Sequence, residues 1–138
     1  NRADGSIFHG HTDSKVSWSF DMRESSSRAC TMGDVRVHLD ALITLPELLS
    51  GSASQRREFA PYIAALREHE LGHFQLYQAT AREIERSLSQ LPTMRKCQTL
   101  ESEANRIGNL LMKTGNEVNV EYDRRTEHGA KNGARLSN

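Results

Sequence analysis

The spacing of the apolar residues changes along the chain, from every second position in the first third to a helical period beyond it. Two early segments, 16–22 and 35–43, alternate large apolar side chains with mostly polar ones. Such alternation places the apolar groups on one face of a β-strand. The polar stretch Arg23 to Arg28 is typical of a turn, so the sequence predicts two antiparallel strands. A shorter third strand is predicted over Ile7 to Thr12.

A long helix is predicted after the small, polar connection at residues 50–54. Its apolar positions recur near a 3.6-residue period from Phe59 to Leu88. Proline lacks the backbone N–H that a helix interior uses, so Pro61 is acceptable only near the first turn. The regular part of the helix should therefore begin close to Pro61, and Pro92 should lie beyond its end.

A second helix is predicted from Thr93, as its N-cap, to Met112 or Lys113, with Gly115 as its stop. It should pack on the first helix through an apolar stripe. The order of elements predicts an α+β fold in one domain, because the 138 residues have about the length of a single core. We expect residues 1–138 to form that domain, with a core over about 6–129 and a flexible tail over 130–138.

The composition argues against two classes of partner. Basic and acidic residues number 18 each, which gives a formal net charge of zero, and no basic excess favours nucleic acid. No window approaches the roughly 18 consecutive apolar residues that a membrane span needs. We therefore expect no nucleic-acid partner and no membrane span.

Residues 69–73 read HELGH, which is an HExxH motif within the first predicted helix. Positions i and i+4 share one face of a helix, so His69 and His73 can bind one metal ion. Glu70 is rotated about 100° around the helix axis and could reach a metal-bound water as general base. The alternative is that both histidines are solvated surface residues. The motif, after an antiparallel strand pair, predicts a catalytic zinc site in a small zincin-like domain.

Catalytic zinc usually takes three protein ligands and keeps a fourth position for water, so a third ligand must come from elsewhere. His128 is favoured because imidazole suits zinc and because Gly129 gives its polar loop backbone freedom. A carboxylate from the second helix or a strand histidine is the alternative. The further candidates are Asp123, Glu121, Glu101, Glu103, His9, His11 and His38.

The two cysteines, Cys30 and Cys97, have no CxxC spacing, which excludes a thiolate metal cluster. A disulfide between them is predicted, and the alternative is two buried free thiols. The bridge would stabilise the fold by roughly 3 to 4 kcal/mol on the chain-entropy model. It would also imply an oxidising compartment.

Two sequence blocks resemble a bacterial family that is filed as domain of unknown function 922 and described as predicted secreted zinc-dependent proteases. One block is HELGHF at 69–74, and the other is YDRRTEHG at 122–129, which resembles the family pattern YDxxTxHG. With the segment ITLP at 43–46 and the paired cysteines, the resemblance covers roughly Trp18 to Gly129. The first block occurs in many metallopeptidases, whereas the second is more particular.

The resemblance implies a protease-like site in a secreted or periplasmic protein. It singles out Tyr122, Asp123, Thr126 and His128 as neighbours of the site and so favours His128 as third ligand. Asp123 could accept the second ring N–H of a ligating histidine, with Thr126 also in this supporting role, or Asp123 could be a turn or cap residue. Tyr122 could donate to the oxyanion of the tetrahedral intermediate, or it could pack on the second helix.

The leading interpretation is a zinc metalloprotease that hydrolyses peptide bonds in a peptide or protein substrate. The edge of the strand that carries Arg36, His38 and Asp40 could bind an extended peptide by strand addition. One alternative is a metal-dependent hydrolase of a bond other than a peptide. Another is a non-catalytic binding module that contains zinc. Substrate and oligomeric state are left open by the sequence.

Overall fold

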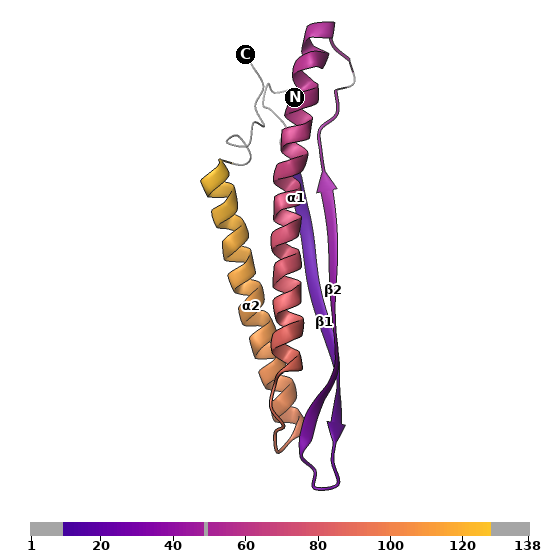
Figure 1. Ribbon diagram of the computed structural model, residues 1–138, viewed down its shortest axis with the longest axis vertical. Coiled ribbons are helices and arrows are strands. Elements are labelled where there is room, and N and C mark those ends of the chain that lie inside the picture. Colours follow the sequence, from indigo (N-terminus) through magenta and orange to yellow (C-terminus); the bar gives the residue numbers. More distant parts are fainter. Residues whose placement is uncertain (1–9, 49, 128–138) are drawn as a thin grey trace. The chain divides into compact units, whose positions relative to one another are not determined.

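The computed structural model describes residues 10–48 and 50–127, which form two strands followed by two helices (Figure 1). Strands β1 (His11–Glu24) and β2 (Cys30–Thr44) are antiparallel neighbours in a two-stranded sheet. Helices α1 (Ala53–Ser89) and α2 (Cys97–Thr126) follow. The predicted α+β fold is confirmed. Residues 7–9 of the predicted third strand lie outside the described residues, and Thr12 belongs to β1.

Both strands extend beyond the alternating segments that predicted them. The turn between them is closed by a hydrogen bond from the Arg28 amide to the Ser25 carbonyl (2.9 Å) and by one from the Ser25 amide to the Ala29 carbonyl (2.8 Å). Arg28 has a φ of 68°, in the left-handed region. A left-handed residue at the end of a three-residue loop is a common way to close a hairpin. The predicted polar turn is therefore found, although β1 continues to Glu24.

Helix α1 begins at Ala53, well before Pro61, so the predicted start of this helix was wrong. Ser52 and Gln55 cap it: the Gln55 amide donates to Ser52 Oγ (3.1 Å), and the Ser52 amide donates to Gln55 Oε1 (2.8 Å). This reciprocal pair is a capping box, which satisfies amides that otherwise lack partners in a first turn. Pro61 lies inside the helix, and the next residue, Tyr62, is buried.

Helix α2 begins at Cys97 rather than at Thr93, and it continues through Gly115 to Thr126. The prediction of Gly115 as a stop was wrong because this glycine serves packing. A Cβ at Gly115 would lie 2.4 Å from Thr80 Oγ1 of α1, so only glycine lets the helices approach so closely there. The helix ends where Glu127 takes a φ of 53°.

The chain divides into two compact units, to each of which β1, β2, α1 and α2 all contribute. Among the described residues, unit 1 comprises 10–14, 41–48, 50–75 and 119–127, and unit 2 comprises 15–40 and 76–118. Unit 1 has a small apolar cluster around Tyr62 and Leu66. The prediction of a single domain over 1–138 stays a prediction.

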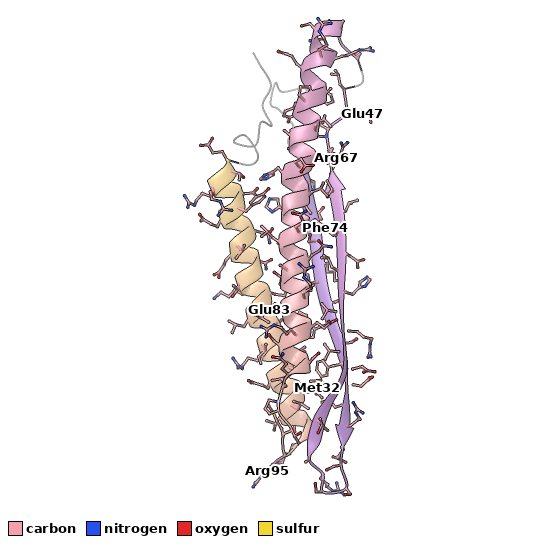
Figure 2. The ribbon with its side chains drawn as sticks, in the orientation of Figure 1. Met32, Glu47, Arg67, Phe74, Glu83 and Arg95 are labelled. Atoms are coloured by element: carbon pink, nitrogen blue, oxygen red, sulfur yellow. A yellow bond between two sulfur atoms is a disulfide. The ribbon has the colours of Figure 1, made fainter. Side chains whose placement is uncertain are left out.

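Unit 2 contains the larger apolar core, and Figure 2 draws its side chains with Met32 labelled. The alternating apolar residues of both strands pack against it, as their spacing predicted. Trp18 of β1 packs against α2, and a Cβ at Gly108 would lie 2.5 Å from its indole ring. The indole Nε1 donates a hydrogen bond to Asn105 Oδ1 (3.0 Å). The buried members of this core are Cys30, Met32, Ile84, Leu88, Leu100 and Ala104.

The predicted disulfide between Cys30 and Cys97 is present and joins the first residue of β2 to the first residue of α2. The Cys30 sulfur belongs to the buried core of unit 2. Two backbone hydrogen bonds pair Cys30 with Met94: one from the Cys30 amide (2.6 Å) and one from the Met94 amide (2.9 Å). The connection between the helices is thus attached to the sheet both covalently and by hydrogen bonds.

The outward faces of the strands are largely polar, and several ion pairs lie along the helices. Arg86 pairs with Glu83 and Arg106 with Glu103, each three residues apart and exposed. Such exposed pairs contribute little to stability because water and salt screen them. Neither helix in the described ranges combines the length and the apolar content that crossing a membrane requires.

We expect the double substitution Cys30→Ser with Cys97→Ser to lower the free energy of unfolding by about 4 kcal/mol, because the bridge closes a long loop in the unfolded chain. Urea unfolding followed by circular dichroism measures this change. Oxidised wild type is the reference, and wild type in reductant should match the variant. Equal unfolding midpoints for oxidised wild type and the variant would show that the bridge adds no stability.

Candidate metal centre

Three polar side chains of the HExxH motif are buried in unit 1. His69 is 1% exposed, Glu70 is 3% and His73 is 8%. A buried polar or charged group costs free energy unless it has hydrogen-bonding or ionic partners. The partners of these three residues therefore show what the site is built to hold.

Most of these partners come from one face of α2. Tyr122 and Asp123 follow Asn119 by three and four residues, and Thr126 follows them by four and three, which places the four side chains on one side of the helix. All four contact the HExxH histidines of α1. The two conspicuous blocks of the sequence thus meet because both lie on helices.

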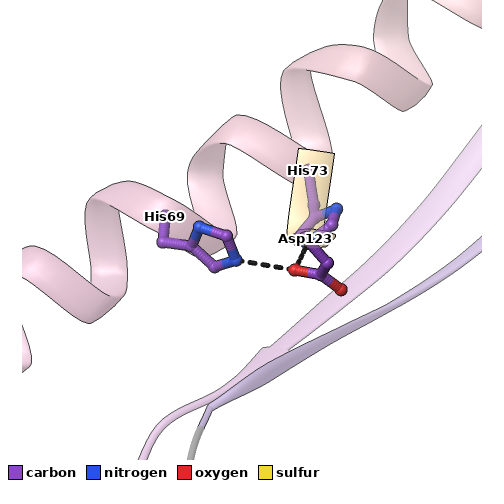
Figure 3. Close-up of side chains that lie close together, drawn as sticks. All are labelled: His69, His73 and Asp123. Carbon is purple, nitrogen blue, oxygen red and sulfur yellow. Dashed lines mark hydrogen bonds and ion pairs between the residues drawn. The ribbon is translucent and has the colours of Figure 1, made fainter. Parts of the chain in front are cut away.

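The carboxylate of Asp123 lies between the two imidazoles (Figure 3). Its Oδ1 is 2.8 Å from Nε2 of His69 and 2.7 Å from Nε2 of His73. The three atoms all lie within 4.8 Å of one another, an arrangement that could hold a metal ion. Tetrahedral zinc with bonds of about 2.0 to 2.1 Å would separate its ligand atoms by roughly 3.3 Å. The two nitrogen–oxygen distances would have to lengthen by only about half an ångström, so the donor set and its spacing fit such an ion.

The other nitrogen of each ring faces an acceptor on α2. Nδ1 of His73 is 2.8 Å from Oδ1 of Asn119. Nδ1 of His69 is 3.4 Å from Oγ1 of Thr126, whose own hydrogen goes to the Tyr122 carbonyl (2.7 Å). That hydroxyl oxygen can therefore accept from His69. With their protons on Nδ1, both rings would offer the Nε2 lone pairs to a metal.

Tyr122 packs against both rings. Its ring stacks on His69 with centroids 4.7 Å apart and meets His73 edge-on at 4.8 Å, while its hydroxyl donates to the His69 carbonyl (3.1 Å). A Cβ at Gly72 would lie 2.2 Å from that hydroxyl, so glycine is needed for this contact. Burial, with the nearby charges of Glu70 and Asp123, raises the pKa of Tyr122, so the phenol stays protonated.

Glu70 receives its partner from the sheet rather than from α2. The hydroxyl of Thr12 on β1 lies 2.7 Å from Oε1 of Glu70 and 3.2 Å from the Glu70 carbonyl. The shorter contact is to the carboxylate, where a donated hydrogen bond is strengthened by the charge. Thr12 shares the inward face of β1 with Val16 and Trp18, and this alternation is the signal that could have placed it beside α1.

Several predicted site residues lie together, and others do not. His69, Glu70, His73, Tyr122, Asp123 and Thr126 form the cluster. His128, the preferred third ligand, lies outside the described residues, as does His9. The other candidates are exposed or turned to different partners: His11 to Asp13, His38 to Asp40, Glu103 to Arg106, Glu121 to Arg124, and Glu101 on the surface.

The position of Asp123 differs in kind from the supporting role that the resemblance implied. A supporting carboxylate would accept from the ring nitrogen that faces away from the metal. Here the Nδ1 atoms contact Asn119 and Thr126, and Asp123 contacts the Nε2 atoms instead. This geometry favours Asp123 as a ligand. Asn119 was not identified from the sequence, because the second helix was predicted to end before it.

No curated protein and no solved structure matches the chain. The sequence pattern of one family matches residues 1–129, which is most of the chain and includes both motif blocks. The chain therefore belongs to the family described as bacterial protein of unknown function (DUF922).

Proposed function

We propose that the protein is a zinc-dependent metalloprotease in which His69, His73 and Asp123 hold the ion and Glu70 is the general base. The single observation that carries the proposal is the direction of the ring nitrogens. Each Nδ1 has an acceptor, and both Nε2 atoms converge on one carboxylate oxygen. Two imidazole nitrogens and a carboxylate oxygen that lie this close together match the donor set of a catalytic zinc site.

The electrostatics of the site support this proposal. Without a bound cation, and with the Asn119 and Thr126 oxygens accepting from both Nδ1 atoms, Asp123 could accept from both Nε2 atoms only if each ring carried a proton on both nitrogens. Two buried imidazolium groups would then share one carboxylate, and one positive charge would lack a partner in that group. Burying such a charge is costly. A divalent cation removes this cost because both imidazoles can stay neutral.

The residues around the histidines suit hydrolysis. A zinc ion supplies the positive charge and Lewis acidity that make a water molecule nucleophilic near neutral pH. Glu70, next to a ligand and held by Thr12 through one oxygen, can take a proton from the attacking water and pass it to the leaving amine. Tyr122 holds the rings in place, and its donation to an oxyanion stays a prediction.

The disulfide supports a secreted or periplasmic setting for this chemistry. Disulfides persist in oxidising compartments and are rare in the cytosol. The bond between Cys30 and Cys97 also removes both thiols of the chain from metal binding. The substrate in this proposal is an extended peptide or protein segment.

Metal content tests the ligand set. We expect about one zinc per wild-type chain by plasma mass spectrometry, because three ligands suffice to hold catalytic zinc. His69→Ala and Asp123→Asn should lose most of the zinc, whereas His38→Ala, on the exposed face of β2, should retain it. His128→Ala decides between the candidate third ligands. If Asp123→Asn retains zinc and His128→Ala loses it, the third ligand is His128 rather than Asp123. If reconstituted wild type holds no zinc, the metal site is refuted.

Catalysis is tested with Glu70→Gln in a peptide-library digestion read by mass spectrometry. We expect cleavage to fall by a factor of about 100 or more, because general-base catalysis typically contributes at least that much. Zinc content should stay at the wild-type level, since Glu70 is not assigned as a ligand. Glu68→Gln, exposed on the same helix, is the matched control and should cleave normally.

Other outcomes of the digestion would change the proposed reaction. If zinc-loaded wild type cleaves no peptide, the hydrolase of a non-peptide bond becomes the better hypothesis. If zinc-edge spectroscopy finds four protein ligands and no water, the ion is structural and the protein is a binding module. Equal cleavage by wild type and Glu70→Gln would remove Glu70 from the mechanism.

A further inference from the structure

We infer that Asn119 is a positioning residue that fixes which nitrogen of His73 faces the metal; this inference rests on the proposed zinc site. Asn119 lies on α2, four residues before Asp123, and its side chain is 5% exposed. Its Oδ1 is 2.8 Å from His73 Nδ1, while Asp123 Oδ1 is 2.7 Å from Nε2 of the same ring. Asn119 and Asp123, one helical turn apart on α2, thus contact the two ring nitrogens of the same histidine.

The chemistry of the amide explains why an asparagine can do this. A neutral imidazole has one N–H donor and one acceptor nitrogen. When the amide oxygen accepts from Nδ1, the proton stays there and Nε2 offers its lone pair to the ion. The same amide turned to present its NH₂ group would place the proton on Nε2 and block coordination. The orientation of Asn119 is therefore coupled to metal binding.

His73 depends on this contact more than His69 depends on its own. The acceptor of His69 is a hydroxyl at 3.4 Å, and its ring is also stacked on Tyr122. The acceptor of His73 is an amide oxygen at 2.8 Å, and the His73 ring lies edge-on to Tyr122 rather than stacked on it. Loss of Asn119 should thus affect His73 selectively.

The first test is zinc affinity, measured by competition with a chromophoric chelator. Asn119→Leu removes the acceptor at similar volume and should weaken zinc binding by about 10- to 100-fold, the usual cost of losing such a support. Asn119→Asp keeps an oxygen at the same place and should remain within a few-fold of wild type. Asn109→Leu, the same change at an exposed position of α2, should leave affinity unchanged.

The main measurement of the second test is made on wild type, so it does not depend on whether a variant folds. Long-range proton–nitrogen NMR spectra of zinc-loaded wild type should show His73 with its proton on Nδ1 and its metal on Nε2. The opposite tautomer would overturn the inference. In folded Asn119→Leu, the Nδ1 proton of His73 should exchange faster with water, while that of His69 is unchanged.

Failure of this inference can be distinguished from failure of the proposed function. If wild type binds no zinc, the metal site itself is refuted. If wild type binds zinc and Asn119→Leu, folded by circular dichroism, binds it equally well, the site stands and Asn119 has no positioning role. If Asn109→Leu weakens zinc binding as much as Asn119→Leu does, the effect is a general one of changes in α2, and the inference is also overturned.

Discussion

One carboxylate oxygen, Oδ1 of Asp123, faces two buried imidazole nitrogens, and the arrangement of unit 1 follows from this contact. It requires α1 and α2 to lie close together at the level of His69 and His73. Gly72 permits that approach because a side chain there would collide with Tyr122. Tyr122 in turn occupies the space over both rings. The glycine inside the HExxH motif is therefore a packing requirement as well as a spacer.

The stability of the fold and its chemistry draw on different residues. The buried residues of unit 2 are apolar and lie around the disulfide, whereas unit 1 buries two histidines, a glutamate and an asparagine. Burying polar groups opposes folding unless each has a partner, and in unit 1 these partners come from Thr12 and from the side chains of α2. The apolar core and the covalent bridge of unit 2 stabilise that unit.

The strands, the helices and the disulfide could be predicted because each depends on local pattern or on pairing of the only two cysteines. The ends of the helices could not, because glycine and proline act through their surroundings. Gly115 has low helix propensity, but its contact with Thr80 keeps it inside α2. The error had a consequence for the site. Because the second helix was predicted to end at Met112 or Lys113, the four-residue spacing of Asn119 and Asp123 did not indicate a shared helix face, and Asn119 was missed.

The donor set also bears on which ion would be held. Two imidazoles and one carboxylate suit zinc and its neighbours among the transition metals, whereas magnesium and calcium prefer oxygen ligands throughout. Structural zinc is usually closed by four protein ligands, often with thiolates. Both cysteines here are bonded to each other in unit 2, whereas His69, His73 and Asp123 belong to unit 1. In the proposed zinc site, three protein ligands would leave the fourth position for water, and Glu70, which Thr12 holds through one oxygen, would be the base that hydrolysis needs.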